Sequence, residues 1–292
     1  METKKIKVAL PAGSLKENTI KLFRKAGFRI DVEDRSYFPL IDDPEIECMF
    51  IRAQEIPRYV ELGKFDFGIT GKDWIEESGK NVMELGGLVY SKRGFNSVRL
   101  VIAVQNDSAI TSLRDLTGKT IATEFVNITN KYLENNKINA AVEFSWGATE
   151  AKVPFLCDAV VELVDSGKSL KANGLRIITT VMESTVRMIT NQSSYGNAWK
   201  RQKMDTLVLL IKSALDSEGM VGLKMNIPEE ATQKILECLP SLRRPTIAQL
   251  TENGWRSVES IMPESEAKKI IPLVKKLGAE GIVEYPLNKI IY

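Results

Sequence analysis

Short apolar runs alternate with amphipathic segments along most of this 292-residue chain. IKVALPA (6–12) has the apolar density of a buried strand. The segment 15–27 repeats its apolar residues every three or four positions, as one face of a helix does, and ends at Gly27. This order of a strand and then a helix recurs, which predicts a parallel sheet with helices on both faces.

Two groups of strands follow from this pattern. In the first group we expect strands over 46–52 and 66–70, with helices over 54–64 and 72–79. The second group has expected strands over 97–105, 120–124, 140–145 and 158–164, separated by helical segments over 112–118, 126–136 and 147–156. Two more extended runs, 175–182 and 184–192, can return the chain to the first group. The pattern therefore predicts two α/β lobes with a cleft between them.

The rhythm changes after a long helix expected over 198–218. The later segments alternate in the order βαββαβ, which is the ferredoxin-like arrangement. The expected strands are 220–228, 245–251, 255–263 and 282–288, and the expected helices are 229–240 and 264–281. We therefore expect lobe I over 1–95 plus 181–212, lobe II over 96–180, and a ferredoxin-like C-terminal domain over 213–292.

Composition narrows the possible functions. A net charge of +2 gives no electrostatic reason to expect a nucleic-acid partner. No apolar run has the length that a bilayer requires, and the N-terminus lacks the apolar core of a secretory signal. We therefore expect a cytoplasmic protein without a membrane partner. Cys48, Cys157 and Cys238 are scattered, which predicts neither a disulfide framework nor a thiolate zinc site.

The chain contains no histidine. This excludes catalytic systems in which histidine activates a serine or a cysteine, imidazole acid–base chemistry and histidine metal ligands. Any catalysis must therefore use carboxylates, lysine, arginine, backbone amides or a hard metal ion bound by carboxylates.

The stretch DAVVELVDSGKSL (158–170) carries the strongest chemical signal. In a strand, Asp158 and Glu162 lie on one face, and buried carboxylates are costly unless they are paired or face a functional cleft. The residues 166–169 can then expose successive backbone N–H groups before a brief helix, where an anion can bind. From the residues alone, a phosphate-binding loop and a solvated turn after an edge strand both stay open. The spacing of a Walker A loop is absent.

Four segments together resemble the ATP phosphoribosyltransferase family. The signature-like segment is GATEAKVPFLCDAVVELVDSGKSLKANGL (147–175), and the others are IPRYVELGKFDFGITGKDW (56–74), LTGKTIATEFVNITNKYLE (116–134) and RRPTIAQL (243–250). The resemblance covers nearly the full chain, and the third domain makes it similar to the long form of that family. It implies an α/β fold whose catalytic part is two-lobed and periplasmic-binding-protein-like. It also implies transfer of phosphoribosyl from phosphoribosyl pyrophosphate to N1 of ATP, with release of pyrophosphate, as the first step of histidine biosynthesis.

The resemblance further implies roles for particular residues. Asp158, Glu162 and Lys168 become the candidate catalytic residues. The residues implied for phosphoribosyl pyrophosphate are Glu150, Asp158, Glu162, Asp165, Ser166, Gly167, Lys168 and Ser169, with 165–169 around the 5′-phosphate. The residues implied for ATP are Gly13, Ser14, Arg52, Gly71, Asp73 and Arg99. Mg²⁺ is implied on the substrate phosphates, with no certain metal ligand in the chain.

Two departures from the family pattern add doubt on the ATP side. Where the family commonly has a basic PKGR-like loop, this chain reads PAGS (11–14), so two anion-neutralising groups are missing and Lys16 is the substitute considered. The spacer FLC (155–157) is shorter than usual and lacks a glycine. Structural alternatives stay open as well, because Arg99 can be paired on a strand edge and Gly71 can be a turn glycine with positive φ.

The C-terminal domain resembles an ACT-like sensor of histidine, which implies feedback inhibition. The residues implied around the histidine effector are Asn226, Leu242, Thr246, Ile261 and Gly281. The alternative for Leu242 and Ile261 is a place in the apolar core. The regulation of the family implies a homo-oligomer, from dimer to hexamer, whose compact state histidine favours.

Two other functions compete with the transferase. Two α/β lobes around a cleft also suit a solute-binding or sensor protein without catalysis. The acidic strand before a phosphate loop argues against that alternative, as does the lack of an evident helix-turn-helix segment. The departures at Ala12 and Ser14 keep a third alternative open, in which only the C-terminal domain functions.

Overall fold

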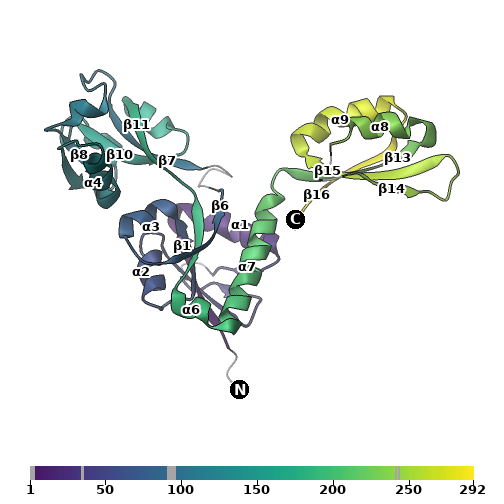
Figure 1. Ribbon diagram of the computed structural model, residues 1–292, viewed down its shortest axis with the longest axis horizontal. Coiled ribbons are helices and arrows are strands. Elements are labelled where there is room, and N and C mark those ends of the chain that lie inside the picture. The colour runs from purple at the N-terminus through teal and green to yellow at the C-terminus, as the bar shows by residue number, and fades with distance from the viewer. Residues whose placement is uncertain (1–3, 34–35, 91–96, 241, 243) are drawn as a thin grey trace. The chain divides into compact units, whose positions relative to one another are not determined.

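The computed structural model describes residues 4–33, 36–90, 97–240, 242 and 244–292. The chain divides into two compact units, the first of Met1–Arg24 and Phe28–Val208 and the second of Lys25–Gly27 and Leu209–Tyr292. Figure 1 shows that each unit is built on its own sheets with helices packed against them. In the described part of the chain, no helix combines the length and the apolar character needed to span a membrane.

The first unit contains two five-stranded sheets, of which the first has the order β4-β1-β5-β12-β6. Its strands are β1 (Ile6–Ala12), β4 (Ile46–Arg52), β5 (Phe67–Gly71), β6 (Met83–Leu88) and β12 (Val186–Thr190). β1 pairs in parallel with β4 and β5, whereas β12 pairs antiparallel with β5 and β6. The three parallel strands lead into α1 (Lys16–Ala26), α2 (Ile56–Glu61) and α3 (Lys72–Ser78), as β-α-β connections require.

The second sheet has the order β11-β7-β10-β8-β9. Its strands are β7 (Val98–Gln105), β8 (Thr120–Thr123), β9 (Ala141–Phe144), β10 (Ala159–Val164) and β11 (Leu175–Ser184). β8 pairs in parallel with both β9 and β10. The segments after these three strands include α4 (Val126–Asn135), the 3-10 helix η3 (Thr149–Lys152) and α5 (Lys168–Ala172). Because the three strands run in one direction, the segments that follow them meet at one edge of the sheet.

Continuous apolar runs place β7 in the middle of a two-sided core. Its residues 100–104 are all buried. Leu100 and Ile102 pack on one face with Ile121 of β8, while Val101 packs on the other face with Val160 of β10. A strand that is covered on both faces needs apolar residues at every position, which is why the run VRLVIAVQ lacks a polar–apolar alternation.

The second unit has a four-stranded antiparallel sheet in the order β14-β15-β13-β16. Its elements in chain order are β13 (Met220–Pro228), η4 (Glu229–Ala231), α8 (Thr232–Cys238), β14 (Thr246–Gln249), β15 (Trp255–Pro263), α9 (Glu264–Lys276) and β16 (Glu280–Pro286). Leu223, Met225 and Ile227 alternate along β13 and pack in one core with Ile235 of α8 and Val274 of α9. The βαββαβ order and this strand order confirm the ferredoxin-like prediction.

Three of the differences between the structure and the sequence-based expectation concern segments next to the connection between the two sheets or the loop before β10. The segment 147–156 was expected to be helical but contains only η3, because Val153 is extended before Pro154, as residues that precede proline tend to be. β6 was not expected, since MELGGL contains two glycines and has no strand pattern. β11 keeps pairing with β7 as far as Ser184, so the chain resumes the first sheet at Val186, later than the expected boundary of 181.

A buried carboxylate joins several elements of the first unit. Asp66 is only 4% exposed. It accepts hydrogen bonds from the backbone N–H of Lys7 at 2.9 Å, the hydroxyl of Ser194 at 2.6 Å and the ammonium of Lys200 at 2.6 Å. These donors belong to β1, to α6 (Gln192–Gly196) and to α7 (Ala198–Asp216). The ion pair therefore fixes the C-terminal segment of the unit to its first strand.

Replacement of Asp66 tests this connection. Asp66→Ala leaves a partly buried ammonium and a buried hydroxyl without their acceptor, so we expect the free energy of unfolding to fall by about 3 to 5 kcal/mol. Urea unfolding followed by circular dichroism measures the change. Asp31, whose ion pair with Arg29 is exposed, provides the matched control, and Asp31→Ala should cost less than about 1 kcal/mol. Equal losses in the two variants would contradict the role of Asp66.

Candidate active site

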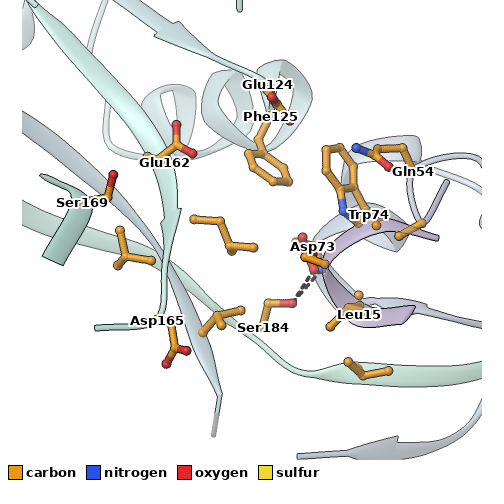
Figure 2. Close-up of a pocket in the computed structure, with 18 of the residues that line it drawn as sticks. Leu15, Gln54, Asp73, Trp74, Glu124, Phe125, Glu162, Asp165, Ser169 and Ser184 are labelled. Atoms are coloured by element: carbon orange, nitrogen blue, oxygen red, sulfur yellow. Dashed lines mark hydrogen bonds between the residues drawn. The ribbon is translucent and has the colours of Figure 1, made fainter. Parts of the chain in front are cut away.

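A cavity of about 470 Å³ lies in the first unit at the carboxyl ends of strands from both sheets, the usual position of ligand sites in α/β folds. Figure 2 shows acidic and aromatic side chains around it. From the first sheet it is lined by residues 12–15 after β1, 52–54 after β4, and Gly71, Asp73 and Trp74 after β5. From the second sheet it is lined by Glu124, Phe125, Glu150 and residues 162–170. Residues 184–186, which connect the sheets, also line it.

The loop 165–169 reaches this cavity directly after β10. Gly167 has φ of +69°, a left-handed conformation, at the residue before α5. A Cβ atom there would lie 3.9 Å from Ile177 Cδ1, so the backbone conformation, and not a lack of space, explains the glycine. Ser166, Lys168 and Ser169 are exposed in the cavity wall. The loop therefore presents hydroxyls, one ammonium and main-chain groups to any molecule in the cavity.

Three carboxylates face the same space, although they come from different strands. Glu162 lies near the end of β10, Glu124 follows β8, and Glu150 belongs to η3. Ser169 Oγ donates a hydrogen bond to Glu150 Oε1 at 2.5 Å, which joins η3 to the loop 165–169. Figure 2 draws Glu162 and Glu124 among the residues that line the cavity from the second sheet. The cavity is therefore acidic on the wall next to the loop.

The half-buried Glu162 is strongly perturbed by this surrounding. Burial raises the pKa of its carboxyl group, and repulsion from Glu150 and Glu124 adds to the effect, while a hydrogen bond from Thr149 lowers it; the resulting pKa is about 7. Glu162 therefore changes its charge near neutral pH. Perturbed carboxyl groups in a cleft are typical of functional sites.

Asp73 connects the two sheets beside the cavity. Its side chain is 2% exposed, and burial raises the pKa of its carboxyl group. Ser184 Oγ donates to Asp73 Oδ1 at 2.6 Å, and the Asp73 backbone N–H donates to Ser184 Oγ at 3.1 Å (Figure 2).

Gly71 has φ of −76°, so the alternative of a turn glycine with positive φ was wrong. A Cβ atom on Gly71 would overlap the Asp73 carboxylate, and this is why glycine is needed.

The first loop of the first sheet also lines the cavity. Gly13 has φ of +82°, and its missing Cβ would lie 4.0 Å from Arg52 Nη1, so the guanidinium lies close to the loop backbone. Ser14 lines the cavity next to it. Lys16 does not take the place of the missing basic residues, because its ammonium lies over the Phe50 ring at 4.5 Å from the ring centre.

Sequence reasoning missed an aromatic wall. Trp74 of α3 and Phe125, just before α4, stack with ring centres 4.5 Å apart and an angle of 29° between their planes. Both rings line the cavity, together with Gln54 and Glu124 (Figure 2). These residues follow strands that were expected, so their position at carboxyl strand ends was the available signal. That the two sheets bring them together could not be read from the sequence.

Two predicted residues lie outside the cavity. Asp158 precedes β10 and accepts a hydrogen bond from the Thr120 backbone N–H at 2.9 Å, with Lys119 Nζ at 3.3 Å. It shares the strand side of Glu162 but lies at the opposite end of the strand, so the structure does not bring it to the cavity with the other residues predicted for the ribose. Arg99 is exposed on β7, and its neighbour Val98 lines the cavity instead. Arg99 pairs in register with Val164, which lines the cavity, so its role at the ATP side stays a prediction.

The residues predicted around an effector lie in the second unit. Asn226 alternates with the core residues of β13 and pairs in register with Ser257 of β15. Gly281 has φ of +57°, and a Cβ atom there would lie 3.5 Å from Asn226 Nδ2. Thr246 pairs with Glu259, whose carboxylate accepts a hydrogen bond from the Tyr285 hydroxyl. Ile261 is half-buried and pairs with Gly222.

Leu242 lies between α8 and β14 and is 41% exposed. Neither Leu242 nor Ile261 belongs to the buried core of the second unit, so the alternative of a core position was wrong for both.

A resident metal centre has no support from the described residues. Among them, no group of three or more Cys, Asp or Glu side chains is placed to hold a metal ion. Mg²⁺ often binds proteins through substrate phosphates while keeping several waters. The donor set of the cavity fits a metal ion that enters with a phosphorylated substrate better than one held in a protein cage.

Comparisons with known proteins identify the family. The family model described as ATP phosphoribosyltransferase matches residues 52–213, and the model of the C-terminal domain of that family matches residues 217–289. An ATP phosphoribosyltransferase of Chlorobium phaeovibrioides is 54% identical over 286 residues, which cover 98% of this chain and 97% of the relative. One of Thermodesulfovibrio yellowstonii is 52% identical over 291 residues, covering all of both chains.

A solved structure is also similar. It is a chain of the ATP phosphoribosyl transferase (HisG:HisZ) complex from Thermotoga maritima, with a TM-score of 0.62 and 25% identity, and the match covers 72% of this chain and 98% of that one. The family models, the full-length relatives and this structure agree with one another. The chain belongs to the ATP phosphoribosyltransferase family, and its additional C-terminal domain makes it a member of the long form.

Proposed function

We propose that this enzyme catalyses the first step of histidine biosynthesis, in which N1 of the adenine of ATP attacks C1 of phosphoribosyl pyrophosphate. The C1–O bond to pyrophosphate breaks as the C1–N1 bond forms on the opposite side, so the ribose carbon is inverted and pyrophosphate leaves. One observation carries the proposal: a single cavity joins the predicted phosphate loop 165–169 to the predicted nucleotide residues of the first sheet. The family match disfavours a solute-binding protein without catalysis.

The second sheet supplies the phosphoribosyl half of the proposed site. The 5′-phosphate lies against the loop 165–169, where Lys168 and main-chain N–H groups provide donors. Glu162 and Glu150 accept hydrogen bonds from the ribose hydroxyls. Because the carboxylate of Glu162 is destabilised in the cavity, its binding to hydroxyl donors stabilises the ionised form. Lys168, which lines the same cavity, also interacts with negative charge on the substrate in this proposal.

The first sheet supplies the nucleotide half of the proposed site. Gly13 and Ser14 offer main-chain and hydroxyl donors, Arg52 offers a cation, and Gly71 gives Asp73 the space to reach Ser184. The ring of Trp74, with the buried Phe125 stacked on one of its faces, gives a purine a flat apolar surface. A stacked base has its ring plane fixed, which aligns N1 with the ribose carbon.

The reaction needs no nucleophile from the enzyme, in agreement with the absence of histidine. Catalysis consists of holding two polyanions in line and stabilising the charge that develops on the leaving pyrophosphate. Mg²⁺ bound to the substrate phosphates would neutralise part of that charge. Arg52 and Lys168 add fixed positive charge from the two sides of the cavity. A cytoplasmic location belongs to the same proposal, because ATP and phosphoribosyl pyrophosphate are intracellular metabolites.

The function is tested by mixing the enzyme with ATP, phosphoribosyl pyrophosphate and Mg²⁺ and measuring pyrophosphate release. We expect stoichiometric formation of a phosphoribosyl–ATP adduct, detected by its ultraviolet absorbance and its mass. A folded enzyme that forms no adduct would disprove the transferase and favour the alternative in which only the C-terminal domain functions.

The loop assignment predicts a specific effect of Gly167→Val. A β-branched residue strongly disfavours φ near +69°, so the loop backbone must shift and the 5′-phosphate loses its donors. We expect the KM for phosphoribosyl pyrophosphate to rise by about tenfold or more, with a smaller effect on the KM for ATP. Gly174 has φ of +70° at the other end of α5 and lies outside the cavity. Gly174→Val therefore carries the same strain as a control and should leave both KM values near those of the wild type.

The acidic wall predicts opposite effects of Glu162→Gln on activity and stability. The pKa of Glu162 is about 7 in the folded protein, above the reference value of 4.5. Between pH 4.5 and pH 7, the folded protein therefore keeps a proton on Glu162 that the unfolded chain has released. The free energy of unfolding therefore falls as the pH rises from 4.5 to 7, and this loss is complete above pH 7. Glu162→Gln should raise the free energy of unfolding by about 1 to 3 kcal/mol at pH 8 and by less at pH 5.

The same variant should lower kcat/KM for phosphoribosyl pyrophosphate by about 10- to 100-fold, because a charged acceptor of the ribose hydroxyls is lost. Glu143 is exposed on β9 and makes a suitable control, and Glu143→Gln should change neither quantity. A Glu162→Gln enzyme that keeps wild-type activity would remove Glu162 from the proposed site.

We also propose that the sheet surface around Asn226 binds histidine and inhibits a homo-oligomeric enzyme, from dimer to hexamer. The support is that four of the predicted residues lie on the sheet of the second unit and do not belong to its buried core. They are Asn226, Gly281, Thr246 and Ile261. Hydroxyl, amide and carboxylate groups near them suit a zwitterionic amino acid. Inhibition requires that histidine bind one conformational or quaternary state better than the other.

Replacement of Asn226 tests this effector site. Asn226→Ala removes an amide that can bond the amino-acid backbone of histidine, so the concentration of histidine that halves the activity should rise by about tenfold. The readout is the ratio of activity with and without histidine in the same preparation. Asn130, exposed on α4 of the first unit, provides the control variant Asn130→Ala, whose inhibition should not change. Unaltered inhibition in Asn226→Ala would move the effector elsewhere.

A further inference from the structure

A single side-chain amide lines the cavity among the residues that the structure describes. It belongs to Gln54, which is exposed and lies two residues after the end of β4. Figure 2 draws it with Trp74 among the residues that line the cavity from the first sheet. No residue in the described ranges hydrogen-bonds this amide. Its carbonyl oxygen and its N–H groups are therefore free to bind a ligand.

The backbone that carries Gln54 is held in place beside the segment that carries Trp74. Gln54 lies in the turn between β4 and α2. The hydroxyl group of Thr70, near the end of β5, donates a buried hydrogen bond to the carbonyl oxygen of Ala53 at 2.7 Å. Trp74 follows three residues after the end of β5. One hydrogen bond thus fixes the turn that carries the amide to the strand that leads to the indole ring.

The proposed reaction restricts the edge by which the enzyme can recognise adenine. N1, which attacks the ribose carbon, lies on the Watson–Crick edge, so a protein group bonded to N1 would block the reaction. The neighbouring edge presents the amino group N6 as a donor and N7 as an acceptor. The amide of a glutamine matches this pair, because its carbonyl oxygen accepts from N6 while its N–H donates to N7. Guanine presents two acceptors at the same edge and does not match.

The charged groups of the cavity cannot take this role. The guanidinium of Arg52 only donates hydrogen bonds, and an ionised carboxylate, such as that of Glu124, only accepts them. Neither kind of group can serve a donor and an acceptor that lie side by side on the base. Gln54 is therefore the side chain of the first sheet that is chemically suited to adenine.

We propose that Gln54 is a specificity-determining residue that binds N6 and N7 of the adenine of ATP while the base stacks on Trp74. This inference rests on the proposed function, because it takes N1 of adenine as the nucleophile. Stacking fixes the plane of the base but allows it to rotate within that plane. Two hydrogen bonds on one edge stop this rotation, so the amide and the ring together direct N1 toward the ribose carbon.

An analogue of ATP tests the bond to N7. In 7-deaza-ATP a carbon replaces N7, while N1 and the amino group N6 are kept. Gln54→Met keeps nearly the shape of the side chain and removes the amide. We expect the ratio of kcat/KM for ATP to kcat/KM for 7-deaza-ATP to be about three- to tenfold higher in the wild type than in Gln54→Met. Any effect of the missing nitrogen on the reactivity of N1 is common to both enzymes and cancels in this comparison.

Two further variants make the test specific. Gln54→Glu keeps an acceptor for N6 but loses the donor for N7, so its ratio should fall to the value of Gln54→Met. Gln202 is exposed on α7 and does not line the cavity, so Gln202→Met should keep the wild-type ratio. Gln54→Met should also lower kcat/KM for ATP by about 10- to 50-fold, because two hydrogen bonds are lost, and should leave the KM for phosphoribosyl pyrophosphate near the wild-type value.

Thermal unfolding of each variant shows that it is folded. A ratio in Gln54→Met equal to that of the wild type would overturn the proposal, as would the same change of ratio in Gln202→Met. In both cases, adduct formation by the wild type would leave the proposed function intact. A folded wild type that forms no adduct would instead remove the proposed function and, with it, the role of Gln54.

Discussion

Burial of Glu162 beside two further carboxylates of one cavity is the constraint on which the rest of the site depends. Burial raises the pKa of the Glu162 carboxyl group to about 7, and repulsion from Glu150 and Glu124 adds to the effect. The carboxylates meet in one cavity because the segments after three parallel strands of the second sheet lie at the same edge of that sheet. A hydroxyl group of the same wall fits this view, since Ser169 donates a hydrogen bond to Glu150. A sugar with vicinal hydroxyls supplies the donors that such a wall lacks.

The second requirement is that both sheets keep their positions around the cavity. Asp73 and Ser184 provide one connection, and the stacked rings of Trp74 and Phe125 provide another. A third comes from Glu77 of α3, whose two carboxylate oxygens accept the backbone N–H groups of Asn127 and Ile128 at 3.0 Å each. These are the first amides of α4, which lack partners inside the helix. One helix thus caps the next, so the two sides of the cavity are fixed to each other by polar and apolar contacts together.

Local pattern predicted the framework of the fold but not the meeting of distant segments. β1 and β4 match their expected bounds because each is a single apolar run, whereas β6 has glycines that only its pairing with β12 explains. The loop 165–169 and Glu162 were found because one continuous stretch carries them. Trp74 and Phe125 were missed, since their contact joins residues about fifty positions apart.

Asp158 shows the limit of periodicity as a guide to a site. Alternation along a strand tells which side a residue faces, and Asp158 and Glu162 do share a side. Four residues of strand separate them by roughly 13 Å, and ligands bind at the carboxyl end. Asp158 at the amino end therefore closes the start of β8 through Thr120 and Lys119. Position along the strand, in addition to the side, decides which carboxylate meets a substrate.

The departure of the first loop from its family pattern can be interpreted with the same geometry. Ala12 and Ser14 bring no charge to the cavity, and Lys16 packs on Phe50. Arg52, from the neighbouring parallel strand, reaches the backbone of Gly13 instead. Adjacent parallel strands end side by side, so a cation lost after β1 can be replaced by one after β4 without any change in the fold. On the proposed function, neutralisation of the triphosphate then depends on Arg52 and the substrate-bound metal, and the loop after β1 is left to contribute main-chain donors at a glycine that permits close approach.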